Sequence, residues 1–401
     1  MKSFLRANFL PMATFLGIAS QGISKEHLNH CSHLKSRYVP DGLHCTWSDE
    51  FGGIEGQGQP QQELNRQNWS YEFIVVNNEQ QVYTKKDCLK NPRQWNTCVS
   101  DGKLTIKGRP LEKPMTCPGD PDCAPSYRNH GNRTASYSSA RITSKTKMEW
   151  QYGYLEFRVR LPDQNRSPQA GSWPAIWTLQ NQIQEGPGTG AKPWPVKGAH
   201  EFDILEWTAR YHFIESNAIW EPTHLKTDLG YNTCNFWPEG GHPACLGPEK
   251  IRRDKNCTGV FDKTPYPDTL GTTHHDANSW IWQRNMVWHQ SPEPHNGEIF
   301  GCHGTSTFDH NGWYIYGYLW NKDAIQVFVN GELKHSLDIK QQGLEGWHQF
   351  KQFLIINMAY GGDLGCKFYH NIDNSDPAAC LKQIKDWSTQ TLEIDYIRLY
   401  Q

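Results

Sequence analysis

The stretch AIQVFVNGEL, residues 324–333, has the character of a β-hairpin. β-Branched and aromatic residues lead up to Asn330 and Gly331, and Asn-Gly is a preferred pair for the two-residue turn between antiparallel strands. Gly, Pro, Asn and Asp interrupt the chain every few residues, and convincing helical periodicity is missing from the sequence. The sequence therefore predicts an all-β protein, a sandwich or a barrel. Seven further segments have strand character: residues 102–110, 139–145, 152–162, 172–179, 312–321, 350–360 and 392–400.

The composition limits the kind of partner. With 37% hydrophobic and 20% charged residues, a chain of 401 residues is long enough to bury a core. The net charge of -2, with Lys and Arg scattered, gives no reason to expect a nucleic acid or a membrane as partner. The 17 Trp and 17 Tyr favour a sugar ligand, because exposed aromatic rings stack on sugar rings. The alternative is that most of these Trp fill the core of the sandwich.

The N-terminus and the cysteines predict export. Lys2 and Arg6 precede a short apolar stretch, so residues 1–22 have the pattern of a signal peptide. Cysteines grouped within Pro- and Gly-rich loops are typical of disulfides formed in an oxidising compartment. Zinc binding is the alternative for part of this set, but no CxxC knuckle or HExxH helix is present. The 12 cysteines group as 31/45, 88/98, 117/123, 234/245/257/302 and 366/380, and glycosylation sequons begin at Asn68, Asn132 and Asn256.

The chain shows no internal repeat and no low-complexity linker. We therefore expect one domain over residues 39–401, preceded by a tail at 23–38 that follows the signal peptide. Two long irregular stretches, residues 182–198 and 221–301, interrupt the domain, and such loops are often walls or lids of a functional site. We expect the protein to be a monomer.

The segment HEFDILEW, residues 200–207, carries the most informative set of carboxylates. Successive side chains of a strand point to opposite faces, so Glu201 and Asp203 share one face, whereas simple alternation turns Glu206 into the core. One extra residue between Asp203 and Glu206, a β-bulge, returns Glu206 to the face of the other two. The pattern therefore predicts a bulge in this strand. An acidic strand that merely faces solvent is the alternative.

Three carboxylates on one face suit glycoside cleavage. Four strand rises of ~3.3 Å separate the outer Cα atoms by about 13 Å. Glutamate side chains that lean inward over a concave sheet can narrow this separation to the ~5–5.5 Å of a retaining glycosidase. Carboxylates this close resist simultaneous ionisation, which raises the pKa of at least one and leaves a neutral acid beside an ionised nucleophile.

The segment HEFDILEW also resembles the bulged active-site signature of glycoside hydrolase family 16. Other segments are similar to its laminarinase-type members in the same order, so that the resemblance extends from about Trp47 to the end of the sequence. It implies a β-jelly-roll sandwich of two antiparallel sheets with a concave substrate cleft, and endo-acting cleavage that retains the anomeric configuration. The segments are NNEQQVYT at 77–84, SARITSKTKMEWQYGYLEFRVRLP at 139–162, GSWPAIWTLQ at 171–180, FLIINMAYGGDLG at 353–365 and IDYIRLY at 394–400.

The resemblance also implies roles for individual residues. Glu201 corresponds to the nucleophile, Asp203 to the residue that orients it, and Glu206 to the general acid/base. Glu50 and Asp395 fall in segments that hold a structural Ca²⁺ away from the cleft in many members, and oxygen ligands of this kind suit calcium. No cofactor is expected for catalysis. The residues expected to bind substrate are Trp173, Trp177, Asn78, Arg141 and Trp207.

The WPAIW motif within residues 173–177 is more similar to enzymes acting on β-1,3-glucan or mixed β-1,3/1,4-glucan than to agarases, carrageenases or xyloglucan transferases. A secreted endo-β-1,3(4)-glucanase is therefore the expected function. The insertion at 221–301 departs from the laminarinase pattern and could reshape the cleft. A transglycosylase, a galactan hydrolase and a non-catalytic β-glucan recognition protein are the alternatives. The presence of both glutamates favours an enzyme over the last of these.

Overall fold

The computed structural model describes residues 31–52, 61–124, 133–162, 171–181, 201–208, 213–220, 259–260, 266–268, 282–289, 312–342, 344–362, 365 and 389–401. Two ten-stranded sheets, here called sheet A and sheet B, pack face to face. Among the strands of the described residues, all pairs are antiparallel except β3 with β6. The described part of the chain holds one short α-helix, α1 (Ile339–Gln342), and the 3-10 helix Glu345–Gln349. The predicted fold class, a sandwich of two antiparallel sheets, is confirmed.

Sheet A has its C-terminal strand in the middle. Its order is β18 (Glu332–Asp338), β17 (Ala324–Val329), β16 (Tyr314–Trp320), β9 (Gly153–Arg160), β20 (Gln390–Tyr400), β5 (Lys103–Cys117), β6 (Arg133–Ser139) and β3 (Val82–Tyr83). Strand β1 (Cys45–Asp49) also pairs with β20, and β4 (Thr97–Ser100) pairs with β5. The Asn-Gly turn lies between β17 and β18 as expected, with Asn330 and Gly331 both in the left-handed region at φ 50° and 86°.

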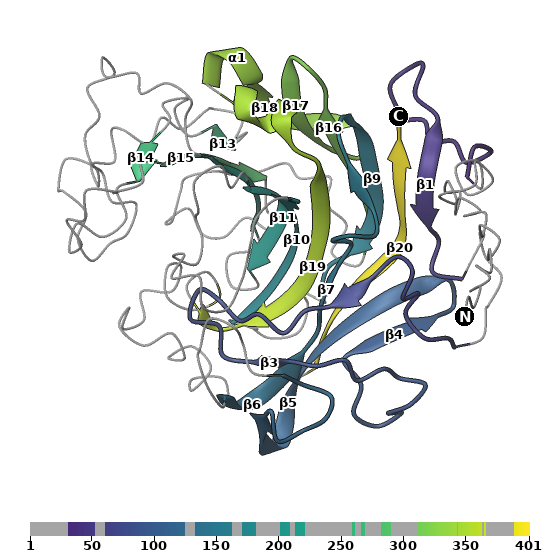
Figure 1. The fold of residues 1–401 in the computed structure, drawn as a ribbon, viewed down its shortest axis with the longest axis vertical. Helices are drawn as coiled ribbons and strands as arrows, with labels where there is room; N and C mark the ends of the chain where they lie inside the picture. The colour runs from purple at the N-terminus through teal and green to yellow at the C-terminus, as the bar shows by residue number, and fades with distance from the viewer. Residues whose placement is uncertain are drawn as a thin grey trace, which may run out of the picture.

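Sheet B is the inner, curved sheet in Figure 1. Its order is β13 (Gly259–Val260), β15 (Trp282–His289), β12 (Phe213–Trp220), β11 (Glu201–Thr208), β10 (Ser172–Gln180), β19 (Gln352–Tyr360), β7 (Arg141–Thr143) and β2 (Ser70–Tyr71). Strand β14 (Tyr266–Asp268) pairs with β15, and β8 (Glu149–Trp150) pairs with β19. The strands β10, β11 and β19 lie side by side and carry the candidate site described below.

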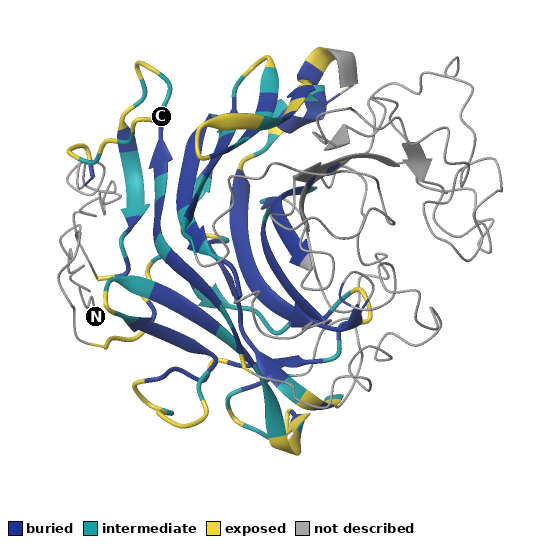
Figure 2. Ribbon diagram, turned by 180° about the vertical axis from the view of Figure 1, so that it is seen from behind, coloured by how far each residue is buried: buried dark blue, intermediate teal, exposed yellow. Residues whose placement is uncertain are grey.

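One hydrophobic core fills the space between the sheets, where both ribbons are buried in Figure 2. Leu155 and Phe157 of β9 enter it from sheet A, and Phe202 and Ile204 of β11 enter it from sheet B. The ring of Phe202 lies 5.0 Å from that of Tyr318 and is also in contact range of the rings of His335 and Trp347. Strand β11 is therefore anchored to the core from the face opposite to its carboxylates.

Replacing Phe202 by Ala should lower the free energy of unfolding by about 3–5 kcal/mol, because the change removes a buried ring and leaves a cavity. Urea unfolding followed by circular dichroism measures this loss. Phe202→Leu is the matched control and should cost less, because it keeps an apolar side chain in the same space. A loss below about 1 kcal/mol for the Ala variant would contradict the anchoring of β11 by this ring.

The N-terminal part of the described chain packs against sheet A. Cys31 is joined to Cys45, the first residue of β1, by a disulfide. The hydroxyl of Ser36 donates a hydrogen bond of 2.6 Å to the carboxylate of Glu156, a fully buried residue of β9. Tyr38 lies so close to Gly331 that a Cβ there would come within 2.6 Å of the ring. Residues 31–38, expected to belong to a tail, are thus packed against the sandwich.

Three of the cysteine groups form disulfides within the group, namely Cys31–Cys45, Cys88–Cys98 and Cys117–Cys123. The other six cysteines lie outside the described residues, as do the predicted signal peptide and the sequons at Asn132 and Asn256. The insertion at 182–198 also lies outside them, and within 221–301 only the backbones of β13, β14 and β15 are described. No helix among the described residues is both long and apolar enough to span a membrane.

Candidate active site

Strand β11 contains the extra residue that the pattern of carboxylates requires. On its β10 side, Asp203 lies opposite Trp177 and Leu205 opposite Ile176, so residue 204 has no opposite residue. On its β12 side, three steps from Asp203 to Glu206 correspond to two steps on the partner strand. The core therefore takes the side chains of Phe202, Ile204 and Leu205. The opposite face carries those of Glu201, Asp203 and Glu206.

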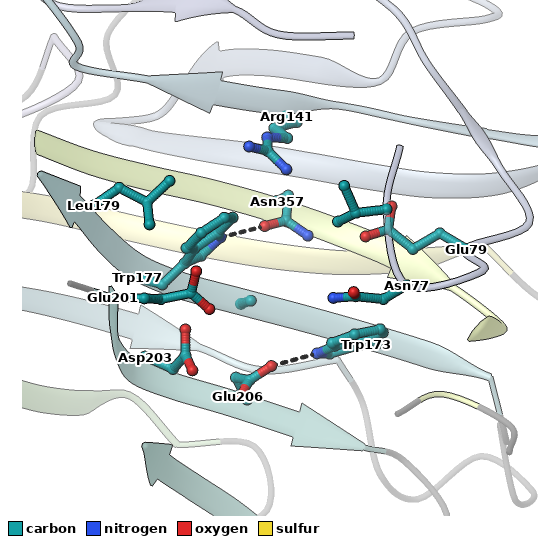
Figure 3. A pocket seen from close by; sticks show the side chains of 12 residues that line it. Asn77, Glu79, Arg141, Trp173, Trp177, Leu179, Glu201, Asp203, Glu206 and Asn357 are labelled. Carbon is teal, nitrogen blue, oxygen red and sulfur yellow. Dashed lines mark hydrogen bonds between the residues drawn. The ribbon is translucent and has the colours of Figure 1, made fainter. Parts of the chain in front are cut away.

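The three carboxylates line an open pocket of about 540 Å³ on the face of sheet B away from the core. Figure 3 shows Glu201 and Asp203 next to each other and Glu206 farther along the same strand, beside Trp173. The pocket is lined by Val76, Asn77, Glu79, Arg141, Trp173, Ala175, Trp177, Leu179, Glu201, Asp203, Glu206 and Asn357.

Strand β10 supplies the aromatic wall of the pocket through its alternate residues. The indole Nε1 of Trp173 donates a hydrogen bond of 2.9 Å to Oε1 of Glu206. The indole Nε1 of Trp177 donates one of 2.8 Å to Oδ1 of Asn357 on β19. Each hydrogen bond fixes the plane of a ring at the edge of the carboxylate cluster, so the pocket offers flat apolar surfaces beside ionisable oxygens.

Arg141 of β7 lies at the other end of the pocket. Its Nε donates a hydrogen bond of 2.7 Å to Oε2 of Glu72, and its guanidinium carbon lies 4.9 Å from the ring centroid of Trp177. Arg141 is the only basic side chain among the described residues that line the pocket. A cation that is already paired with a carboxylate gives little attraction for an anionic ligand, so the pocket suits a neutral ligand better than an anionic one.

Removing the indole N–H while keeping an aromatic ring tests the contact with Glu206. Trp173→Phe should lower kcat by about tenfold, the equivalent of one lost hydrogen bond to a charged group. Steady-state kinetics measures the change, and Trp173→Leu, which also loses the ring, should raise KM in addition. An unchanged kcat in the Phe variant would mean that this hydrogen bond has no part in the function of Glu206.

Two expected substrate contacts are placed differently by the structure. Trp207 is 1% exposed and belongs to the core between the sheets. Alternation explains this, because once the bulge turns Glu206 toward the pocket, the next residue must face inward. Asn78 is exposed and does not line the pocket, whereas Asn77 does. Both have left-handed φ values, 50° and 57°, and this turn directs the two side chains differently.

The residues expected to bind calcium form ion pairs in the structure. The carboxylate of Glu50 accepts hydrogen bonds of 2.9 and 2.7 Å from Nε and Nη2 of Arg398. Asp395 forms an ion pair of 2.5 Å with Arg158. No group of three or more His, Cys, Asp or Glu side chains that could hold a metal ion is found in the described part of the chain. Calcium binding by Glu50 and Asp395 stays a prediction.

The side chain of Asn68, the first residue of a predicted sequon, already has a hydrogen-bonding partner. Its Nδ2 donates a hydrogen bond of 2.8 Å to the buried carboxylate of Asp49, which also accepts one from the indole of Trp69. Burial raises the pKa of Asp49, and these hydrogen bonds oppose the rise. A glycan on the Asn68 nitrogen would therefore replace one of the donors to a buried carboxylate.

Besides Asn77, two polar pocket residues were not expected from the sequence. Glu79 is only 3% exposed, and its burial raises the pKa of its carboxyl to about 7. Asn357 is the only polar residue inside the run of residues 353–360 on β19, all of which are buried. A lone amide in a buried strand was the signal that could have identified it. For Glu79 no sequence signal was available, because it precedes the two-residue strand β3 and residues 81–84 are all buried whichever way their side chains point.

Several known proteins are similar to this chain over most of its length. No family model matches the chain. The chain is 30% identical over 378 residues to glucan endo-1,3-β-glucosidase A1 of Niallia circulans, covering 90% of this chain and 38% of that protein. It is 29% identical over 379 residues to a glucan endo-1,3-β-glucosidase of Cryptopygus antarcticus, covering 92% of this chain and 95% of that protein.

A crystal structure of a non-specific endo-β-1,3(4)-glucanase from glycoside hydrolase family 16 has a TM-score of 0.52 at 20% identity, covering 90% of this chain and 96% of that one. The chain spans between 33% and 48% of the length of the first three curated relatives that it matches. The chain thus has the fold of a family 16 glycoside hydrolase and is similar over at least 90% of its length to two glucan endo-1,3-β-glucosidases.

Proposed function

We propose that this protein is a retaining endo-glycosidase that hydrolyses β-1,3-glucan or mixed β-1,3/1,4-glucan. The observation that carries the proposal is the bulge of β11, which aligns Glu201, Asp203 and Glu206 in one pocket beside two indole rings. Relatives named as glucan endo-1,3-β-glucosidases support the substrate class. So does a solved structure of similar fold that presents 1,3-β-cellobiosyl-glucose at its active site.

The first step of the proposed reaction is a displacement at the anomeric carbon. A carboxylate oxygen of Glu201 attacks this carbon, and the bond from the carbon to the glycosidic oxygen breaks as its electron pair moves to that oxygen. Glu206, neutral at this stage, transfers its proton to the leaving oxygen. The result is a glucan chain with a new hydroxyl end and a covalent ester between the remaining sugar and Glu201. Trp173 then holds the Glu206 carboxylate through its 2.9 Å hydrogen bond.

The second step releases the sugar with its original configuration. Glu206, now ionised, takes a proton from water, and the water oxygen attacks the anomeric carbon while the bond to Glu201 breaks. Asp203, next to Glu201 in Figure 3, orients the nucleophile and shares a proton with it for part of the cycle. Both enzyme carboxyls return to their starting state. The scheme needs no cofactor.

Product profiling on laminarin, lichenan, agarose and carrageenan, with and without a sugar acceptor, tests the proposal. Internal cleavage of laminarin or lichenan, with products that first appear in the β configuration by NMR, is the expected result. Cleavage of agarose or carrageenan alone would make the protein a galactan hydrolase. Products longer than the acceptor would indicate a transglycosylase. Binding of β-glucan with no cleavage would make it a recognition protein and overturn the proposal.

We also propose that the protein works outside the cytoplasm. Three disulfides in the described residues support this, because such bonds persist in oxidising compartments. The pattern of residues 1–22 supports it as well. Expression of the full chain in its source cells, followed by mass spectrometry of the medium, tests the proposal. A mature chain that stays in the cell with residues 1–22 attached would contradict it.

A further inference from the structure

The pocket contains a fourth carboxylate that the proposed reaction does not use. Glu79 lies across the pocket from the carboxylates of β11 in Figure 3. Its backbone is held by a bridge to Gly361 and by a 2.9 Å hydrogen bond from its N–H to the carbonyl of Val76. Gly362 packs so closely that a Cβ there would come within 2.5 Å of the carbonyl oxygen of Asn77 and 3.0 Å of the Glu79 nitrogen. The position of Glu79 is therefore fixed by the main chain.

A chain of hydrogen bonds connects Glu79 to the aromatic wall. The hydroxyl of Tyr83 donates a hydrogen bond of 2.9 Å to Oε2 of Glu79. Nδ2 of Asn357 donates one of 3.2 Å to the Tyr83 oxygen, and Oδ1 of Asn357 accepts the 2.8 Å hydrogen bond from Trp177. We call this series of three hydrogen bonds the Trp177 relay. In each of them the donor hydrogen points toward the Glu79 end of the series.

Both ends of the relay require this direction. The indole N–H of Trp177 can only donate, so Asn357 turns its carbonyl oxygen to the indole and its NH₂ group to Tyr83. Tyr83 accepts from Asn357 and therefore uses its single proton on Glu79, which as an ionised carboxylate can only accept. Hydrogen bonds to an ionised group are about twice as strong as neutral ones. A neutral carboxyl group accepts more weakly, so the strength of the relay depends on the charge of Glu79.

A second donor reinforces the acceptor role of Glu79. Nε2 of Gln81 donates a hydrogen bond of 2.7 Å to the same oxygen, Oε2. The amide of Gln81 is itself oriented by the main chain, because its Oε1 accepts a hydrogen bond of 2.8 Å from the N–H of Tyr360. Two donors therefore converge on one carboxylate oxygen, which is an arrangement that suits a charge.

The groups that face Glu79 come from three elements. Arg141 of β7 and Arg133 of β6 attract its charge, and Arg133 also donates hydrogen bonds to the backbone carbonyls of Glu79 and Gln81. Tyr83 of β3 is the remaining titratable neighbour that contacts it. Burial is the largest influence on Glu79 and raises its pKa to about 7, with the two arginines opposing the rise. Glu79 therefore changes charge near neutral pH.

We propose that Glu79 is a positioning residue that fixes the Trp177 indole for substrate binding, acting through Tyr83 and Asn357. The inference rests on the proposed function, because the ligand is taken to be a β-glucan stacked on this ring. Ionised Glu79 holds the ring more firmly in its binding orientation than protonated Glu79 does. Substrate affinity therefore rises as the pH rises through the pKa of Glu79, whereas the chemical step depends on the carboxylates of β11.

Kinetics of Glu79→Gln and Tyr83→Phe on laminarin test the inference. Both variants should raise KM by about fivefold, the worth of one net hydrogen bond, and leave kcat within about twofold. The KM of the unmodified protein should fall as the pH rises through about 7, and this change should be absent in Glu79→Gln. Glu63→Gln is the matched control, because Glu63 pairs with Lys90 at the surface, and it should keep the original KM at every pH.

A substrate-free measurement reads the Trp177 relay directly. The indole N–H signal of Trp177 in ¹H–¹⁵N NMR spectra, assigned by its loss in Trp177→Phe, should shift with a midpoint near pH 7, the pKa of Glu79. The shift should disappear in Glu79→Gln. A signal that titrates identically in both proteins, or kinetic constants that are unchanged in two folded variants, would overturn the inference.

The outcomes also separate the inference from the function on which it rests. A protein that cleaves no β-glucan but shows the pH-dependent shift of the Trp177 signal refutes the proposed function and supports the relay. A protein that cleaves laminarin and has the same KM in Glu79→Gln at all pH values refutes the relay alone. Circular dichroism of each variant identifies any that fail to fold, and Tyr83→Phe then serves as the second test.

Discussion

Glu201→Ala is expected to lower kcat on laminarin by about four orders of magnitude or more, because the variant has no group that can form the covalent intermediate. The side chain of Glu201 lines the pocket and makes no part of the hydrophobic core, so the folded structure should survive the change. Reducing-sugar release by purified variant and parent measures the effect. The surface variant Glu63→Ala, made in the same way, should keep full activity.

Azide identifies the role of Glu201 beyond the loss of rate. The substrate for this test is a β-glucan oligosaccharide with an activated aryl leaving group at its anomeric carbon, in the β configuration. Azide can enter the space left by the missing carboxylate and attack that carbon directly. One displacement then occurs instead of two, and the product is the α-glycosyl azide. Formation of a β-glycosyl azide by Glu201→Ala would mean that a different residue is the nucleophile.

The second large effect is expected at Glu206. Glu206→Gln keeps the shape of the side chain and can still accept the hydrogen bond from Trp173, but it has no proton to give. The value of kcat on laminarin should fall by about a thousandfold, within the usual contribution of a general acid. An aryl substrate with a leaving group of low pKa needs no such proton, so the formation of the intermediate on that substrate should be nearly normal.

Azide again separates the roles. In Glu206→Ala the nucleophile remains, so azide should accelerate the breakdown of the accumulated intermediate and give the β-glycosyl azide. If azide gives no acceleration with the aryl substrate, Glu206 is not the acid/base. The two glutamate variants should thus give azides of opposite configuration from one substrate. This comparison is sharper than the loss of activity, which any damage to the pocket would also cause.

Much of the fold and the position of the carboxylates could be predicted from local pattern. Side chains of a strand alternate with a fixed period of two, so Glu201, Asp203 and Glu206 can share a face only if a bulge adds one residue between the last two. The hairpin at Asn330 and Gly331 followed from turn chemistry that depends on two residues only. These features are encoded by neighbours in the sequence, so sequence alone determines them.

Local pattern could not predict contacts with partners that are distant in the chain. Glu50, expected to bind calcium, forms an ion pair with Arg398, 348 residues away. Asn357 gained its role from Trp177 and Tyr83, which lie on other strands. Trp207 was an error of a different kind, since the predicted bulge already turned this residue inward.

The central place of β20 in sheet A has a consequence for the nascent chain. Thr46, next to the first residue of β1, donates a hydrogen bond to the carbonyl of Leu399, a residue 353 positions later. As synthesis proceeds from the N-terminus, β5 and β9 are made early. They can pair with β20, which lies between them, only after residues 390–400 have been made. Unpaired strand edges recruit other chains, and contacts this distant form slowly. Sheet A can therefore close only after residues 390–400 have been synthesised, and until then the facing edges of β5 and β9 are open to pairing with other chains.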